Sequence, residues 1–173
     1  MDRPIFLVGF MGSGKTTWGK KLANHLGLMF VDLDQVIVQR IGMSIPAYFE
    51  RYGEQRFREI ESQLLKEQGG LPAVISTGGG SPCFFDNMQW ILQNGLAIYL
   101  HLTPKALYNR LQQSNIAARP ALKGLAGEAL LHFIEEKLRE REPFYKQSQI
   151  HIDQINTSLE AIGQSIESYE KSI

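Results

Sequence analysis

A glycine-rich motif near the N-terminus restricts the fold of this chain more than any other feature. Residues 9–16 read GFMGSGKT, which matches the P-loop pattern of Gly, four free positions, Gly, Lys and Ser or Thr. An apolar run at 5–8 precedes the motif, and residues 15–26 read as the helix that follows it. The sequence therefore predicts a strand, a loop and a helix that together bind the phosphates of a nucleoside triphosphate.

Each residue type in this motif suits phosphate binding. Glycines let successive backbone N–H groups turn toward phosphate oxygens, and the helix N-terminus adds partial positive charge. Lys15 is placed to reach the β- and γ-phosphates, and the Thr16 hydroxyl to bind Mg²⁺. A glycine-rich turn before an ordinary helix is the alternative, but a chance match is expected in only on the order of 1% of chains this long. The predicted ATP-binding residues of the motif are Gly12, Ser13, Gly14, Lys15, Thr16 and Thr17.

The composition is that of an ordinary globular protein and favours a single domain over residues 1–173. The formal net charge is zero, and no run of Lys and Arg gives the electrostatic footprint of a nucleic-acid or membrane-surface binder. No apolar stretch approaches the roughly 20 residues that span a bilayer, and the N-terminal one is too short for a secretion signal. We therefore expect no nucleic acid and no membrane among the partners.

Cysteine and histidine usage narrows the expectations further. Cys83 is the only cysteine, which excludes an intramolecular disulfide and favours a reduced, cytoplasmic compartment. Its side chain is expected to be a small buried hydrophobe. The four histidines are scattered and lack metal-ligand spacing, so no zinc site is expected. No apolar seam indicates obligate assembly, and a monomer is the default expectation.

Short apolar segments alternate with segments of helical period, which predicts an α/β fold with a parallel sheet covered by helices on both faces. The strand candidates are residues 5–8, 29–31, 73–76, 96–102 and 150–152. Thr103 and Pro104 supply an N-cap and a first-turn proline for a helix that runs to Leu111. A second helix is predicted over 128–141. The long connection at about 113–127 is the best candidate for a lid.

Two carboxylates follow the second predicted strand. In a parallel sheet, Asp32 and Asp34 emerge at the carboxyl edge, beside the P-loop. One could hold Mg²⁺ and the other could accept a hydrogen bond from a substrate hydroxyl, as phosphoryl transfer to an alcohol requires. The alternative is a helix N-cap, for which Asp is favoured. The predicted metal ligands are Thr16 and Asp32.

Glycines and one arginine complete the candidate site. Residues 77–80 read TGGG at the end of the third predicted strand, where a ligand or another backbone could approach closely, although a flexible turn is the alternative. Arg58 and Glu61 share one face of a predicted helix and could pair as an ordinary i,i+3 surface contact.

Taken together, these motifs resemble the shikimate kinase family in order and spacing. They are GFMGSGKT at 9–16, DLD at 32–34, FREIE at 57–61, STGGG at 76–80, RP at 119–120 and REPFY at 141–145. The resemblance implies a three-layer sandwich with a central five-stranded parallel sheet of the P-loop NTPase type. It also implies transfer of the ATP γ-phosphate to the 3-hydroxyl of shikimate, in chorismate and aromatic amino-acid biosynthesis.

The resemblance also implies roles for individual residues. Asp34 would hold the shikimate hydroxyls, in a substrate-binding segment at about 33–61, and Arg119 would be the lid arginine that reaches the phosphates. The remaining implied residues are Arg58 and Arg141 at the shikimate carboxylate, Gly78, Gly79 and Gly80 lining its pocket, Ile45, Phe49 and Phe57 packing its ring, and Arg110 near the adenine. Lys15, Asp34 and Arg119 would form the catalytic set.

The physical chemistry of shikimate agrees with these roles. Shikimate is a small ring with a carboxylate on one side and hydroxyls on the other, so its site needs cations near the carboxylate and hydrogen-bond acceptors near the hydroxyls. Spacing alone does not separate Arg141 from Arg139, although the register of Arg-x-Pro-x-Tyr favours Arg141. The choice of ATP over GTP comes from the resemblance, since residues 153–156, where the family closes over adenine, specify little here.

Two other readings remain open. A kinase of the same fold that acts on gluconate or a nucleoside monophosphate would share the P-loop but should lack the acceptor-side residues as a set. A nucleotide-dependent switch that binds guanine should carry an Asn/Thr-Lys-x-Asp motif, and the sequence has none.

Overall fold

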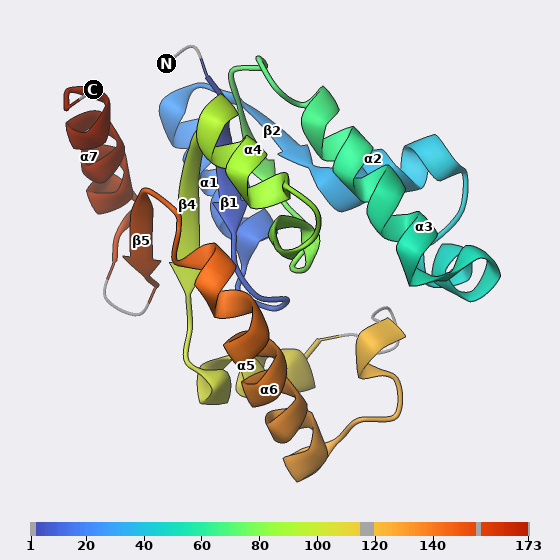
Figure 1. Ribbon diagram of the computed structural model, residues 1–173. Coiled ribbons are helices and arrows are strands. Elements are labelled where there is room, and N and C mark those ends of the chain that lie inside the picture. The colour runs from blue at the N-terminus through green and yellow to red at the C-terminus, as the bar shows by residue number, and fades with distance from the viewer. Residues whose placement is uncertain (1–2, 115–119, 155–156, 173) are drawn as a thin grey trace.

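A parallel sheet forms the centre of the molecule (Figure 1). The computed structural model describes residues 3–114, 120–154 and 157–172, and within them five strands pair in the order β2-β3-β1-β4-β5. All four pairings between neighbouring strands are parallel. The strands are β1 (Ile5–Val8), β2 (Met29–Asp32), β3 (Ala73–Ser76), β4 (Leu96–His101) and β5 (Ile150–Asp153).

Helices connect the strands and cover both faces of the sheet, so the expected three-layer architecture is confirmed. They are α1 (Lys15–Leu26), α2 (Leu33–Ile41), α3 (Ile45–Glu67), α4 (Asn87–Asn94), α5 (Pro104–Gln112), α6 (Gly127–Tyr145) and α7 (Leu159–Glu170), with short 3₁₀ helices η1 (Ser81–Cys83) and η3 (Pro120–Leu122). In the described part of the chain, no helix combines the length and the apolar character that crossing a membrane requires.

Alternate side chains of the strands pack against two separate helix layers. On β1, Ile5 and Leu7 join a core cluster with residues of α1 and α7, among them Leu22 and Ile166. Phe6 points to the opposite face, where it joins a second cluster with residues of α2 to α6. In Figure 1, α1 lies behind the sheet and α4 in front of it. The apolar runs therefore read as continuous because both faces of each central strand are buried.

The observed elements match the predicted ones with small differences at their ends. The helix after the P-loop has the predicted bounds, and the Thr103 side chain caps α5 by accepting a hydrogen bond from the Ala106 amide at 3.3 Å. A break inside α3 was not predicted: Gly53 has φ 80° and ψ 170°, outside the helical range. The segment after this break carries Arg58 and Glu61.

This topology brings the predicted site segments together. The segments that follow β1, β2 and β3 all leave the carboxyl edge of the sheet, and these three strands are neighbours in the order β2-β3-β1. The P-loop, the two aspartates and the triple glycine therefore share one edge, as expected for ligand sites in open α/β sheets.

Candidate active site

The P-loop wraps around the N-terminus of α1. Gly14 caps the helix in the left-handed conformation, with φ 88°. The Lys15 ammonium donates hydrogen bonds to the carbonyl oxygens of Gly9 at 2.8 Å and Phe10 at 3.0 Å, and its side chain is largely buried. The loop thus holds a positive charge close to the phosphate-binding amides.

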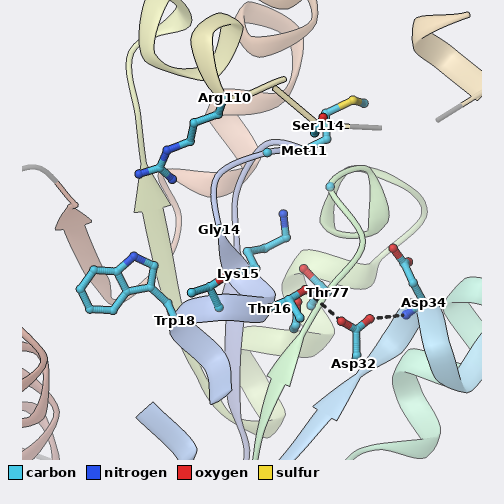
Figure 2. Close-up of a pocket in the computed structure, with 14 residues that line it drawn as sticks. Met11, Gly14, Lys15, Thr16, Trp18, Asp32, Asp34, Thr77, Arg110 and Ser114 are labelled. Atoms are coloured by element: carbon cyan, nitrogen blue, oxygen red, sulfur yellow. Dashed lines mark hydrogen bonds between the residues drawn. The ribbon is translucent and has the colours of Figure 1, made fainter. Parts of the chain in front are cut away.

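A cavity of about 570 Å³ opens above this loop (Figure 2). Trp18 and Arg110 lie at one end of it in this view and Asp34 at the other. Of the predicted ATP-binding residues in the described chain, Ser13 alone is absent from the cavity wall, because its side chain is buried. The lining residues are Met11, Gly12, Gly14, Lys15, Thr16, Thr17, Trp18, Asp32, Asp34, Ser76, Thr77, Gly79, Arg110 and Ser114.

Asp32 uses its two carboxylate oxygens differently. Oδ1 accepts a hydrogen bond from the Asp34 amide at 3.1 Å and caps α2, while Oδ2 accepts one from the Thr16 hydroxyl at 2.9 Å (Figure 2). Asp32 therefore caps α2, as the alternative reading expected, and it also lies next to Thr16. Two hard oxygens next to a phosphate-binding loop fit Mg²⁺, which takes its other ligands from phosphates and water.

A second cavity, of about 390 Å³, adjoins the first. It contains both predicted acceptor arginines, and it shares Met11, Asp34 and Gly79 with the cavity above the P-loop. Asp34 therefore stands where the two cavities meet. The lining residues are Met11, Asp34, Ile45, Phe49, Glu54, Phe57, Arg58, Glu61, Gly78, Gly79, Gly80, Ala121 and Arg141.

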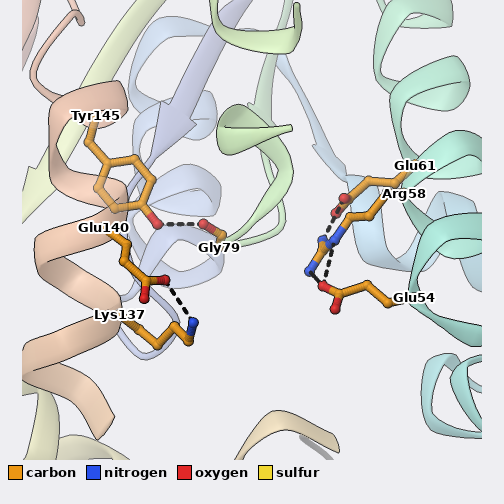
Figure 3. Close-up of polar contacts among 7 residues, drawn as sticks. All are labelled: Glu54, Arg58, Glu61, Gly79, Lys137, Glu140 and Tyr145. Atoms are coloured by element: carbon orange, nitrogen blue, oxygen red, sulfur yellow. Dashed lines mark hydrogen bonds and ion pairs between the residues drawn. The ribbon is translucent and has the colours of Figure 1, made fainter. Parts of the chain in front are cut away.

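Arg58 and Glu61 pair as predicted, but the description of this pair as an ordinary surface contact is wrong. Glu61 is 1% exposed, and its carboxylate lies 2.7 Å from the Arg58 guanidinium, which also binds the exposed Glu54 at 3.1 Å (Figure 3). Burial raises the pKa of Glu61 to about 7, although the charge of Arg58 opposes the shift. Helical spacing showed which residues share a face, but not that the glycine turn covers it.

Arg141 and Arg139, which spacing did not separate, lie in different places. Arg141 is partly buried, lines the second cavity and has its guanidinium 5.7 Å from the centre of the Phe10 ring. Arg139 is exposed. The preference for Arg141 that came from the sequence register thus agrees with its position in the fold.

The triple glycine lies where side chains would collide with site residues. A Cβ on Gly80 would lie 2.9 Å from the Arg58 guanidinium, and one on Gly79 would lie 2.9 Å from the backbone nitrogen of Met11. The turn therefore requires glycine for close approach, which favours the functional reading over that of a flexible turn.

Two residues near Arg110 had no role predicted from the sequence: Trp18, which lines the cavity above the P-loop, and Gln154, which is hydrogen-bonded to it. Gln154 accepts hydrogen bonds from Trp18 and Arg110, both at 3.1 Å, and donates one to the Ser13 carbonyl at 2.6 Å. Trp18 follows the P-loop lysine by less than one helical turn, which was a usable signal. Gln154 falls in the segment at 153–156, whose letters specified little, and only the fold brings the end of β5 to the P-loop.

The predicted lid falls partly outside the described residues, and Arg119 with it. The described part of this connection includes η3, where Ala121 lines the second cavity and Leu122 is fully buried. Cys83, expected to be a small buried hydrophobe, is half-buried and packs against the core cluster. It lies in η1, which follows the triple glycine.

The chain is similar to known proteins in both sequence and structure. A family model described as shikimate kinase matches residues 11–170. The shikimate kinase of Parabacteroides distasonis is 47% identical over 150 residues, which cover 86% of this chain and 86% of that protein. The crystal structure of shikimate kinase from Bacteroides thetaiotaomicron superposes with a TM-score of 0.86 at 37% identity and covers 98% of each chain. The shikimate kinase of Acinetobacter baumannii, solved in complex with shikimate, superposes with a TM-score of 0.85 at 32% identity, over 98% of this chain and 93% of that one.

Proposed function

The chain belongs to the shikimate kinase family, and from this premise we propose that it transfers the γ-phosphate of ATP to the 3-hydroxyl of shikimate, giving shikimate 3-phosphate and ADP. The observation that carries the proposal is the position of Asp34. It lines both the cavity above the P-loop and the cavity that contains Arg58 and Arg141. A phosphate in the first cavity and a hydroxyl of an acid in the second would meet at this carboxylate.

We call the cavity above the P-loop the nucleotide cavity. There, Lys15 and the P-loop amides would hold the phosphates, and Arg110 would lie near the adenine. Thr16 and Asp32 would hold Mg²⁺ through the Thr16 hydroxyl oxygen and Asp32 Oδ2, which lie 2.9 Å apart. The ion, when bound, neutralises charge that develops on the transferring group.

We call the second cavity, which contains Arg58 and Arg141, the acceptor cavity. There, the positive charge of these arginines would orient shikimate. Its carboxylate would bind Arg58 and Arg141, because guanidinium groups match carboxylates with charge-assisted hydrogen bonds. Gly78, Gly79 and Gly80 would line the ring. The apolar side chains of Ile45, Phe49 and Phe57 line the same cavity and would pack against its faces.

This orientation leaves the hydroxyls of shikimate near Asp34, which would accept a hydrogen bond from the attacking one. The hydroxyl oxygen then forms a bond to the γ-phosphorus as the bond to the ADP oxygen breaks, and the hydroxyl proton leaves along its hydrogen bond to Asp34. Positioning and charge stabilisation supply most of the rate in such transfers. The protein needs no covalent intermediate.

The lid and the assembly belong to the proposal as well. We assign Arg119, on the connection at about 113–127, to the transferring phosphate in the closed enzyme. The whole chain, 1–173, would act as one kinase domain and as a monomer, since residues of a single chain line both cavities. The one cysteine supports a cytoplasmic location.

Release of ADP in the presence of different acceptors tests the function. The protein should turn over ATP with shikimate and not with gluconate, a nucleoside monophosphate or no acceptor. Turnover with gluconate in place of shikimate would make the protein a different kinase. Slow hydrolysis that does not depend on the acceptor would indicate a nucleotide-dependent switch.

Two variants in the same assay test the acceptor orientation. Arg141→Ala should raise the KM for shikimate about 10- to 150-fold, the value of a lost charge-assisted hydrogen bond, and change the KM for ATP far less. Arg139→Ala is the matched control and should change both constants less than about twofold. Equal losses for both substrates, or from both variants, would contradict the assignment.

The pH dependence of shikimate binding should follow the ionisation of Glu61. The carboxyl group is neutral below its pKa of about 7 and negative above it, and it faces Arg58, Arg141 and Asp34. Above pH 7 its charge competes with the shikimate carboxylate for Arg58. We therefore expect the KM for shikimate to rise roughly 5- to 10-fold between pH 6 and pH 8.

Glu61→Gln removes this titration while it keeps the shape of the side chain, so its KM for shikimate should stay flat over the same range. Glu54→Gln is the control, because Glu54 binds the same guanidinium from the exposed side and should leave the pH slope in place. An unchanged slope in Glu61→Gln would assign the titration to another group.

A further inference from the structure

The C-terminal end of α6 is tied to the glycine turn by one buried side chain. Tyr145 is fully buried, and its hydroxyl donates a hydrogen bond to the carbonyl oxygen of Gly79 (Figure 3). Burial raises the pKa of Tyr145 well above its usual value, so the hydroxyl stays protonated and remains a donor at neutral pH. Neither the motifs nor the charge pattern assigned this tyrosine a role.

The other carbonyl groups of the turn are also held by the protein. Gly78 accepts a hydrogen bond from the Ser81 amide at 3.1 Å, and Gly80 accepts one from the Cys83 amide at 2.9 Å. Tyr145 supplies the third bond, and it is the one that comes from outside the turn and η1. Figure 3 shows it reaching Gly79 from α6, on the side opposite Arg58.

Peptide geometry links this bond to the acceptor cavity. The Gly79 carbonyl and the Gly80 N–H belong to one planar trans peptide, so they point in opposite directions. A carbonyl held toward Tyr145 therefore turns the Gly80 N–H away from α6. Gly80 lines the acceptor cavity, and its α-carbon is so close to Arg58 that a Cβ there would lie 2.9 Å from the guanidinium.

We propose that Tyr145 is a positioning residue for the acceptor: its bond to Gly79 presents the Gly80 N–H, next to Arg58, to the anionic group of the substrate. The same helix carries Arg141 one turn earlier, so α6 sets both a cation and, through Tyr145, an amide donor of one anion site. The inference rests on the proposed function, since shikimate supplies the anion.

Tyr145→Phe removes the hydroxyl and keeps the ring. We expect the KM for shikimate to rise about 3- to 10-fold, as for one lost hydrogen bond, with kcat and the KM for ATP changed less than about twofold. Tyr99→Phe is the matched control, because Tyr99 is also buried and its ring centre lies 5.3 Å from that of Tyr145. It should leave the KM for shikimate unchanged.

A lower melting temperature with an unchanged KM for shikimate would reduce Tyr145 to a structural role and overturn the proposal. Parallel increases in both KM values would overturn it too. If the variant does not fold, the unmodified protein still provides a test by NMR. Saturating shikimate should move the Gly80 amide proton downfield and leave that of Gly95 in place, and a stationary Gly80 signal would reject the inference. Absence of any shikimate turnover by the unmodified enzyme would instead refute the proposed function.

Discussion

Asp34→Asn should lose about 10²- to 10⁴-fold in kcat while it binds ATP normally. The substitution keeps the size of the side chain and removes the charge that orients the attacking hydroxyl. Asp34 lines both the nucleotide and the acceptor cavity, and in the proposed function its carboxylate would lie beside the attacking hydroxyl. Steady-state kinetics together with ATP binding by calorimetry measures the two effects separately.

Asp32→Asn provides the comparison for this result. Asp32 binds the Thr16 hydroxyl and caps α2, so its variant should raise the Mg²⁺ concentration needed for half-maximal activity. Asp34→Asn should leave that concentration unchanged. If Asp34→Asn instead lost its affinity for ATP and kept its affinity for shikimate, Asp34 would belong to the metal site.

The strand and helix pattern was predictable because burial on both faces leaves short apolar runs between helical segments. The bounds of α1 and the cap at Thr103 followed from local signals that act within a few residues. The break at Gly53 was not predicted, because a single glycine inside a helical pattern is compatible with a continuous helix.

The site was predictable where its residues follow strands in sequence. The P-loop follows β1, Asp32 ends β2 with Asp34 two residues later, and the triple glycine follows β3. Parallel strands end at one edge of the sheet, so these segments meet there. Residues that reach this edge from elsewhere gave weaker signals. The roles of Arg58 and Arg141 were predicted only from the family resemblance, and no contact was predicted for Gln154.

The burial of individual side chains was the property least predictable from the sequence. Glu61 was read as a surface partner of Arg58, yet the glycine turn covers it, and a Cβ on Gly78 would lie only 2.6 Å from its carboxylate. The same burial raises its pKa to about 7 and gives the acceptor site a group that titrates at neutral pH. Such a shift depends on long-range packing, which spacing along a helix does not show.

Lys15→Met should reduce turnover about 10³-fold or more in a protein that remains folded. Its ammonium stands at the P-loop, where the structure places it on the Gly9 and Phe10 carbonyl oxygens. In the transition state, negative charge is spread over the equatorial oxygens of the transferring group and builds on the leaving oxygen of ADP. A fixed cation in a partly closed cavity stabilises this charge more than water does. Methionine keeps most of the length and the apolar stem of the side chain, and it removes the charge and its hydrogen bonds.

Lys20→Met is the matched control, because Lys20 lies on the same helix and is exposed. It should change kcat and both KM values less than about twofold. Circular dichroism and thermal denaturation show whether the Lys15 variant keeps the fold without the two bonds to the loop. A folded Lys15→Met enzyme with more than about a tenth of normal kcat would mean that the P-loop amides, Mg²⁺ and the lid neutralise the transition state without this lysine. The P-loop motif would then account for nucleotide binding alone, and the source of catalysis would lie at Asp34 and the acceptor arginines.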